Sequence, residues 1–228
     1  MEPDADITKM PLLEEEDKLA LKGIVINRPA GFLLFRENER TTETYLIIKG
    51  HVKVTSGGPD RVMAIRGPGE VVGEMSALDG QPRSTDVWAM EDIQVKVILQ
   101  REWIDFLYSR PRVFHALVQM LSARLREATT KQSQASWFGI EQRLAKGLVE
   151  LTAKLGIASA DGIVIRGVSQ HELAGLIGAK KRDSVSPVIR VFRDQGLLST
   201  SRQLFVIHDL GRIKEIAEGG ATALEGAK

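Results

Sequence analysis

The chain has 228 residues, of which 43% are hydrophobic and 27% are charged, and its formal net charge is +1. These values are typical of a globular protein with one or two domains, and they give no strong field that would indicate a polyanionic partner. The sequence contains no cysteine, which excludes disulfides, thiolate zinc sites and Cys-ligated iron–sulfur clusters.

The first twenty residues are acidic, with seven Asp or Glu residues against two lysines. This segment lacks the basic and apolar regions of a signal peptide. No apolar run in the chain approaches the ~20 residues that are needed to span a bilayer. We therefore expect a cytoplasmic protein with no membrane association.

Residues 24–108 are predicted to form a series of short strands. β-branched and aromatic runs alternate there with Gly, Pro, Asn and Asp, which punctuate strands. The expected strands are 24–27, 32–35, 44–48, 52–55, 62–65 and 93–99. Many short strands at close spacing favour a small barrel, roll or sandwich.

A loop between two of these strands, Gly73–Thr85, combines a carboxylate with a guanidinium. Glu74 precedes Arg83 by nine residues, and small, turn-forming residues separate them. Glycine allows backbone amides to approach a ligand, and Arg can bind a phosphate through two charge-assisted hydrogen bonds. Glu74 can accept a hydrogen bond from a sugar hydroxyl. The loop therefore suggests a nucleotide site, and a solvated salt bridge in a turn is the alternative on these residue types alone.

From Pro111 onward the hydrophobic pattern becomes helical. Apolar residues recur at alternating steps of four and three, which predicts a narrow seam. The seam consists of Phe114, Val118, Leu121, Leu125 and Ala128. It would pack against another helix, or a single helix would cover the roll. Residues 136–139 are expected to act as a hinge, and a second amphipathic helix is expected to end at Gly156.

Residues 168–196 predict a helix–turn–helix. Ser169 and Glu172 can form a capping box at the start of the first helix, and Gly178 can supply the turn. A strand at 163–165 and a hairpin at 197–207 would make this a winged helix, which places its second helix in the DNA major groove. The alternative is a helical hairpin with no DNA partner.

The turn of this motif carries a basic triplet, Lys180, Lys181 and Arg182, where cations would meet phosphates. The alternative is a solvated charge run. Pro187 in mid-helix would cost ~3 kcal/mol because it removes a hydrogen bond and clashes with the preceding turn. We therefore predict that the second helix begins at Asp183 or Ser184, where the missing amide needs no partner.

Three sequence blocks in order, 29–35, 45–54 and 73–85, match the pattern of cyclic-nucleotide-binding domains. Together with the seam and the winged helix, they make residues 24–216 resemble the Crp/Fnr superfamily of bacterial transcription regulators. The resemblance implies an α+β fold. Its parts would be an acidic arm at 1–22, a cyclic-nucleotide-binding β-roll at 23–109, a central dimerisation helix and hinge at 110–138, and a winged helix–turn–helix DNA-binding domain at 139–228.

The resemblance also implies a function and its residues. A homodimer would bind palindromic double-stranded DNA under allosteric control by a cyclic nucleotide, expected to be cAMP, and would contact RNA polymerase. Glu74 would accept from the ribose hydroxyl, while Arg83 and Ser84 would bind the cyclic phosphate. The implied ligand-binding residues are Gly73, Glu74, Met75, Arg83, Ser84, Thr85, Arg124 and Thr129. The implied DNA-binding residues are Ser169, Gln170, His171, Lys180, Lys181, Arg182, Ser184, Ser186 and Arg190.

Some positions depart from the family pattern. Thr85 stands where cAMP-binding members usually have Ala, and Ala128 with Thr129 replaces two adjacent hydroxyl residues. The identity of the base therefore stays open. In the DNA-binding part, the turn is one residue longer than usual, and Pro187 replaces a position that is often polar.

Two alternatives follow, namely a regulator that responds to another nucleotide or to none, and a nucleotide-sensing module that acts through protein partners. We expect no enzymatic activity, because phosphate-loop and dinucleotide-binding spacings are absent and the four histidines are scattered. No metal, haem or iron–sulfur cofactor is expected.

Overall fold

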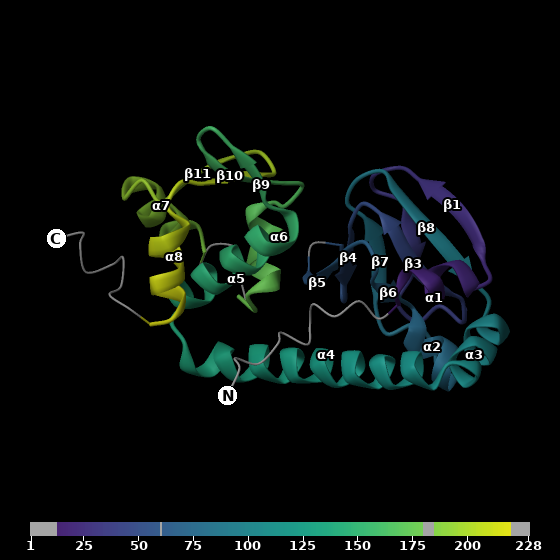
Figure 1. The fold of residues 1–228 in the computed structure, drawn as a ribbon. Helices are drawn as coiled ribbons and strands as arrows, with labels where there is room; N and C mark the ends of the chain where they lie inside the picture. Colours follow the sequence, from purple (N-terminus) through teal and green to yellow (C-terminus); the bar gives the residue numbers. More distant parts are fainter. Residues whose placement is uncertain (1–12, 60, 180–184, 220–228) are drawn as a thin grey trace, which may run out of the picture. The chain divides into compact units, whose positions relative to one another are not determined.

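A computed structural model describes residues 13–59, 61–179 and 185–219 (Figure 1). The chain divides into two compact units, Met1–Pro59 with Ala64–Thr129, and Thr130–Lys228 with Asp60–Met63. The expected α+β class is confirmed, since a strand-rich N-terminal part, a long helix and a C-terminal helix–turn–helix follow one another. Within the described ranges, no helix has the length and apolar character that a membrane span requires.

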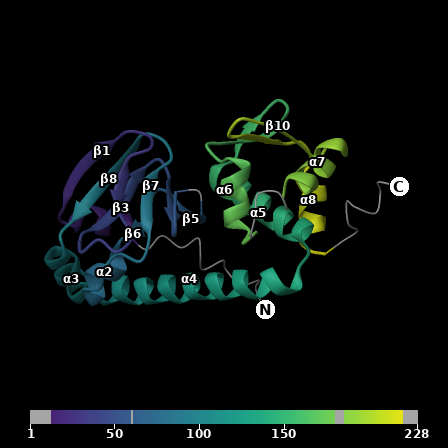
Figure 2. The same cartoon turned by 180° about the vertical axis from the view of Figure 1, so that it is seen from behind.

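Two four-stranded sheets form the body of the first unit (Figure 2). One has the strand order β1-β8-β3-β6 and the other has the order β2-β7-β4-β5. The strands are β1 (Ile24–Arg28), β2 (Leu33–Phe35), β3 (Thr44–Lys49), β4 (Val52–Thr55), β5 (Val62–Arg66), β6 (Val71–Val72), β7 (Asp86–Ala89) and β8 (Ile93–Ile98).

The alternation of side chains along these strands separates two hydrophobic clusters. Neighbouring residues of a strand point to opposite faces. Ile47 and Val72 accordingly join the cluster between the sheets, whereas Leu46 and Val71 join a cluster that the helices cover. The strand core is therefore closed on both faces, which makes a roll with a buried interior.

Four helices belong to or adjoin this unit: α1 (Glu15–Ala20), α2 (Glu74–Asp79), α3 (Gln100–Ser109) and α4 (Pro111–Trp137). Trp103 of α3 and Leu117 of α4 are almost completely buried in the helix-covered cluster. The α1 helix takes part in this packing, because the buried carboxylate of Asp17 pairs with Arg110 and Arg112 at the start of α4.

The second unit contains α5 (Ile140–Leu155) and a four-stranded sheet of order β11-β12-β10-β9. Its remaining elements are β9 (Ile157–Ser159), β10 (Gly162–Arg166), α6 (Gln170–Leu176), α7 (Ser186–Asp194), β11 (Leu198–Ser201), β12 (Leu204–Ile207) and α8 (Leu210–Ala217). The α6 and α7 helices, followed by the β11–β12 hairpin, form a winged helix.

Candidate functional site

The candidate ligand site is built at the junction of β6 and α2. Gly73 has a φ of 79°, a left-handed conformation that L side chains rarely adopt, and it turns the chain directly into α2. Glu74 is the first residue of α2, and only 4% of its surface is exposed. Oε1 of Glu74 accepts a hydrogen bond from Nη1 of Arg124 at 2.7 Å. The central helix α4 is thus tied to the start of the predicted sugar-binding loop.

Arg124 is held by several groups of the roll. Its Nη2 donates to the carbonyl of Val71 at 2.9 Å and lies 3.9 Å from the carboxylate of Glu70. Burial lowers the pKa of Arg124, while the charge and hydrogen bond of Glu74 act in the opposite direction. Glu74 therefore supplies the counter-charge that makes burial of this guanidinium tolerable.

A second arginine extends these ion pairs along the same contact. Arg66, at the end of β5, lies 3.5 Å from Glu70 and 3.8 Å from Glu127, one turn after Arg124 on α4. Two arginines and three carboxylates thereby connect the roll to one short stretch of α4. Sequence reasoning found Glu74 and Arg124 and missed the other members, which no spacing motif marks.

Arg83 forms the other half of the site, and its side chain is almost completely buried. Nη1 donates to the carbonyl of Gly73 at 2.7 Å, Nη2 donates to the carbonyl of Glu43 at 2.7 Å, and Nε donates to Oγ1 of Thr41 at 2.9 Å. The guanidinium carbon lies 4.2 Å from the centroid of the Phe35 ring. The cation is thus fixed directly beside the backbone that carries Glu74.

Burial and the neighbouring groups of Arg83 shift its pKa in opposite directions. Burial lowers its pKa, whereas Tyr45, Glu43, Glu39 and Glu74 all act to raise it. Thr41, Glu43 and Phe35 were not predicted as site residues. Thr41 and Glu43 lie in a loop that pairs with the backbone of Arg83, since the backbone amide of Arg83 donates to the carbonyl of Glu39 at 2.9 Å. No local sequence signal marks this long-range pairing.

The remaining predicted ligand-binding residues are less integrated into this contact network. Ser84 and Met75 are exposed, and Thr85, two residues after Arg83, is half-buried. Thr129 is exposed, and its hydroxyl donates to the carbonyl of Leu125 within α4 at 2.9 Å. The geometry thus brings Gly73, Glu74, Arg83 and Arg124 together, and among the described contacts it gives Thr129 a partner only in its own helix.

The chemical capacity of the site follows from these groups. An ionised carboxylate has two oxygens, so Glu74 can accept from a hydroxyl while Arg124 stays bound. Arg83 has five N–H donors, of which three are used in the hydrogen bonds described above. The two that remain can bind a phosphate. A buried carboxylate and a buried guanidinium therefore meet at Gly73.

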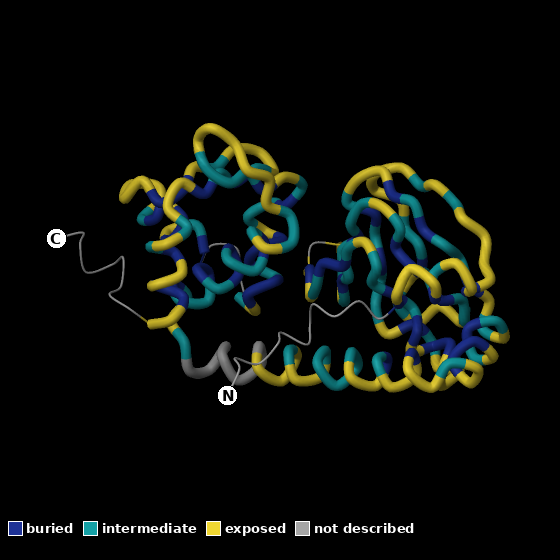
Figure 3. The backbone as a smooth tube through the Cα atoms, viewed as in Figure 1, coloured by how far each residue is buried: buried dark blue, intermediate teal, exposed yellow. Residues whose placement is uncertain are grey.

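The seam predicted on α4 divides between two faces, and exposed and half-buried residues alternate along the helix (Figure 3). Leu121 packs against the helix-covered cluster of the roll, so this member of the predicted seam takes part in covering the roll. Phe114, Val118 and Leu125 remain 48%, 46% and 69% exposed. One face of this helix therefore covers the roll and the other leaves an apolar stripe open, so packing of the stripe against another helix stays a prediction.

The candidate DNA-binding motif begins with the predicted capping box. Oγ of Ser169 accepts from the amide of Glu172 at 3.1 Å, and the Glu172 carboxylate accepts from the amide of Ser169 at 2.8 Å. Gly178, with a φ of 66°, ends the first helix of the motif. The amide of Ala179 donates back to the carbonyl of Ala174 at 2.9 Å, as expected for an α-helix that ends in a residue with left-handed backbone conformation.

The second helix of the motif, α7, begins at Ser186 with Val185 as its N-cap. The predicted start at Asp183 or Ser184 was therefore too early. Pro187 is the second helical residue, where its missing amide needs no partner. The reason for expecting the helix to start after the basic triplet therefore holds. The predicted contacts Lys180, Lys181, Arg182 and Ser184 lie outside the described residues. His171 and Arg190 are exposed, while Gln170 and Ser186 are half-buried.

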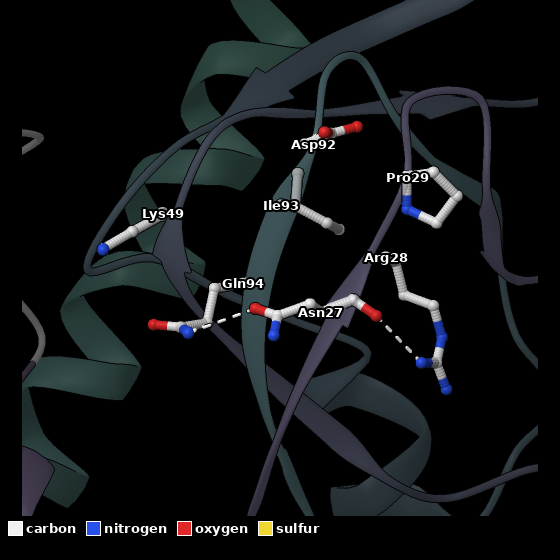
Figure 4. Close-up of a pocket in the computed structure, with 7 residues that line it drawn as sticks. All are labelled: Asn27, Arg28, Pro29, Lys49, Asp92, Ile93 and Gln94. Atoms are coloured by element: carbon white, nitrogen blue, oxygen red, sulfur yellow. Dashed lines mark hydrogen bonds between the residues drawn. The ribbon is translucent and has the colours of Figure 1, made fainter.

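A shallow pocket of about 410 Å³ lies elsewhere, at the end of β1 (Figure 4). It is lined by Asn27, Arg28, Pro29, Lys49, Asp92, Ile93 and Gln94. None of these residues belongs to the Glu74–Arg83 loop. The side-chain amide of Gln94 donates to Asn27 across the pocket at 3.1 Å. We assign this pocket no ligand.

Two family models match the chain. The cyclic nucleotide-binding domain matches residues 25–109, and the Crp-like helix-turn-helix domain matches residues 142–216. The Cyclic AMP receptor protein of Thermus thermophilus is 29% identical over 194 residues, which cover 84% of this chain and 87% of the relative.

Solved structures give the same picture. The Catabolite Activator Protein of Thermus thermophilus is 30% identical, with a TM-score of 0.50, and the match covers 93% of this chain and 100% of that one. The c-di-GMP responsive global regulator CLP of Xanthomonas campestris has a TM-score of 0.71 at 24% identity, covers 85% of this chain and 97% of its own, and supports the fold alone.

Proposed function

Because the chain belongs to the Crp/Fnr family of transcription regulators, we propose that it is a dimeric DNA-binding regulator whose affinity for DNA is set by a cyclic nucleotide, cAMP in the first instance. The observation that carries this proposal is the convergence of Glu74 and Arg83. Nη1 of Arg83 donates to the carbonyl of Gly73 at 2.7 Å, and the next residue is the buried carboxylate Glu74.

In this proposal the cyclic phosphate binds the two remaining donors of Arg83, and Ser84 adds its hydroxyl. Arg is suited to this role because its planar guanidinium matches a phosphate with two parallel hydrogen bonds. The ribose hydroxyl donates to Glu74, while the loop amides of Gly73 and Met75 border the ligand. Thr85 lies on the phosphate side of the loop.

The ion pair between Glu74 and Arg124 supplies the route from ligand to DNA. A ligand changes a conformational equilibrium only by binding its two states with different affinity. Glu74 would contact both the sugar and α4, so ligand affinity depends on where Arg124 and α4 lie. Thr129, about one turn further along α4, would come close to the base once α4 is in place.

The open stripe of Phe114, Val118 and Leu125 fits a second copy of the chain. The dimer would present two α7 helices to operator half-sites one helical turn apart. Phosphates and base edges would be contacted by Ser169, Gln170 and His171 at the start of α6, by Ser186 and Arg190 of α7, and by Lys180, Lys181, Arg182 and Ser184. Activation of transcription would also involve contact with RNA polymerase. The protein would act in the cytoplasm.

A second effector class has one observation in its favour. The hydroxyl of Thr129 is engaged within its own helix, and Ala128 offers no polar group, so base selection would differ from that of a pocket with two hydroxyls. The Xanthomonas campestris regulator of the same fold is described as c-di-GMP responsive. The fold therefore leaves room for another nucleotide.

The proposal is tested by selecting duplexes from a random-sequence DNA library with the full chain, in the presence and absence of cAMP. We expect a palindromic consensus with half-sites about 10 base pairs apart, bound more tightly with cAMP and more weakly as salt rises. If no sequence is enriched and the amount of DNA retained does not change with salt, the result would instead favour a module that acts through protein partners.

A further inference from the structure

Glu43 places a carboxylate beside the cation that is proposed to bind the phosphate. Its Oε2 lies 3.5 Å from Nη2 of Arg83, and its own backbone carbonyl accepts from the same nitrogen at 2.7 Å. The side chain is 35% exposed, so the carboxylate lies at the border between the buried guanidinium and solvent. An incoming phosphate thus meets a negative charge that is already paired with Arg83.

The donors of Arg83 show why this matters. Each terminal nitrogen of the guanidinium uses one N–H for a backbone carbonyl, that of Gly73 or that of Glu43. One N–H on each nitrogen remains among the described contacts, and a phosphate that takes both brings its oxygens next to the Glu43 carboxylate. The charges at this point lie in a partly buried site, where they are screened less than in water.

We propose that Glu43 is a specificity-determining residue that favours ligands with one phosphate charge over ligands with two. The inference rests on the proposed function, because it concerns the same phosphate site. The single positive charge of Arg83 is already balanced by Glu43. A cyclic phosphodiester adds one negative charge, whereas a phosphomonoester carries about −1.5 to −2 at pH 7. The repulsion from Glu43 therefore falls more heavily on the monoester.

Other acidic groups act in the same direction without being as close. Glu39 and Glu74 add to the negative field at Arg83, alongside Glu43. Glu39 is occupied in its own loop, where its carboxylate accepts from the amide of Arg36 at 2.9 Å. Glu74 is occupied by Arg124. Among these three carboxylates, Glu43 is the one that forms an ion pair with Arg83.

The substitution Glu43→Gln tests the charge with little change in shape. The backbone carbonyl that holds Nη2 is unaffected by the substitution, so Arg83 keeps its three hydrogen bonds. Glu91→Gln is the matched control, because Glu91 is also a partly exposed acid of the roll and pairs with His51 rather than with Arg83. Both variants lose one carboxylate charge.

The experiment measures, by calorimetry on the full chain, the Kd of cAMP, of 5′-AMP and of the O-methyl ester of 5′-AMP. The methyl ester has an open phosphate with one charge, so it separates charge from ring shape without any mutation. We expect the wild type to bind the ester better than 5′-AMP. We also expect the ratio of the Kd for 5′-AMP to that for cAMP to fall about tenfold in Glu43→Gln and to stay unchanged in Glu91→Gln.

The inference is overturned if the ratio is the same in Glu43→Gln as in the wild type, or if cAMP affinity falls in that variant without any change in the ratio. The latter result would make Glu43 only a support for Arg83. Arg83→Ala, measured in parallel, distinguishes failure of this inference from failure of the proposed function. If cAMP binds and depends on Arg83 but the ratio is fixed, this inference alone fails; if no cyclic nucleotide binds, the proposed function fails and the inference with it.

Discussion

Arg124 donates a hydrogen bond to Glu74 at 2.7 Å across fifty positions of the sequence, and this ion pair joins the central helix to the Gly73–Thr85 loop. The Glu74 side chain is 5% exposed and the Arg124 side chain is 21% exposed, so water screens the pair only partly. The residue proposed to recognise the sugar is therefore also the residue that holds α4 against the roll.

Loss of Arg124 should destabilise the protein as well as weaken ligand control. Arg124→Ala leaves the Glu74 carboxylate buried without its main partner, which costs about 3 kcal/mol in comparable buried pairs. We expect the free energy of unfolding, measured by urea denaturation, to fall by roughly that amount. Arg126→Ala, on the exposed side of the same helix, should change it by less than about 0.5 kcal/mol. Equal effects of the two substitutions would contradict a structural role for the pair.

Gly73 should tolerate no side chain, for reasons of both conformation and space. A Cβ at this position would lie 2.5 Å from Nη1 of Arg83 and 2.9 Å from the carbonyl oxygen of Glu43, in addition to the strain of a φ of 79°. Gly73→Ala should displace Arg83 and reduce cyclic-nucleotide affinity at least tenfold. Gly31→Ala is the control, since it has a φ of 78° and open space around its Cβ. Both should lose stability through strain, about 1 kcal/mol, and only Gly73→Ala should lose binding.

The open stripe of α4 should mediate self-association. Leu125 is 69% exposed in the isolated chain, and full burial of a leucine contributes about 1.5–3 kcal/mol. Leu125→Glu changes the stripe in both copies and should weaken a dimer about 100-fold or more. Sedimentation velocity should show a shift to monomer at micromolar concentration. Tyr108→Glu, in α3 and 81% exposed, should leave the sedimentation coefficient unchanged. Monomeric wild-type protein would contradict this assignment.

Arg190 should contribute an electrostatic contact to DNA. It is exposed on α7, and its guanidinium lies 3.9 Å from Asp194 in a solvated pair that carries little energy. If Arg190 neutralises one phosphate, Arg190→Ala should reduce the slope of log affinity against log salt by about one. Fluorescence anisotropy with the selected duplex measures this slope. Lys214→Ala, exposed on α8, should keep the wild-type slope. An unchanged slope in both variants would place α7 away from the DNA backbone.

Local patterns predicted much of this fold, because they are set by neighbours in sequence. The capping box of Ser169 and Glu172 and the end of α5 at Gly156 lie where their spacing places them. The strand β7 was missed, since it has only four residues and Asp86 makes its first position polar. The α3 helix was also missed, because its burial depends on Trp103 packing against residues from both ends of the unit.

The candidate site was predicted only where one short loop carries it. Glu74 and Arg83 are close in sequence, whereas Glu43 and Thr41 reach Arg83 from forty or more positions away. Arg66 and Glu127 meet through the packing of α4 on the roll, which no local spacing encodes. The division of the α4 seam between two faces likewise depends on how the helix docks, so Leu121 and Leu125 could not be separated by periodicity alone.

The most direct test of the central claim is calorimetric titration of cAMP into the wild-type chain and into Arg83→Ala. We predict one binding site per chain in the wild type. A charge-assisted hydrogen bond contributes about 1.5–3 kcal/mol, so loss of a two-bond contact should weaken binding about 100-fold or more in Arg83→Ala. Arg101→Ala, whose side chain is 91% exposed on α3, should bind as the wild type does. Equal affinity in the wild type and Arg83→Ala, or no binding of cAMP to the wild type, would contradict the account.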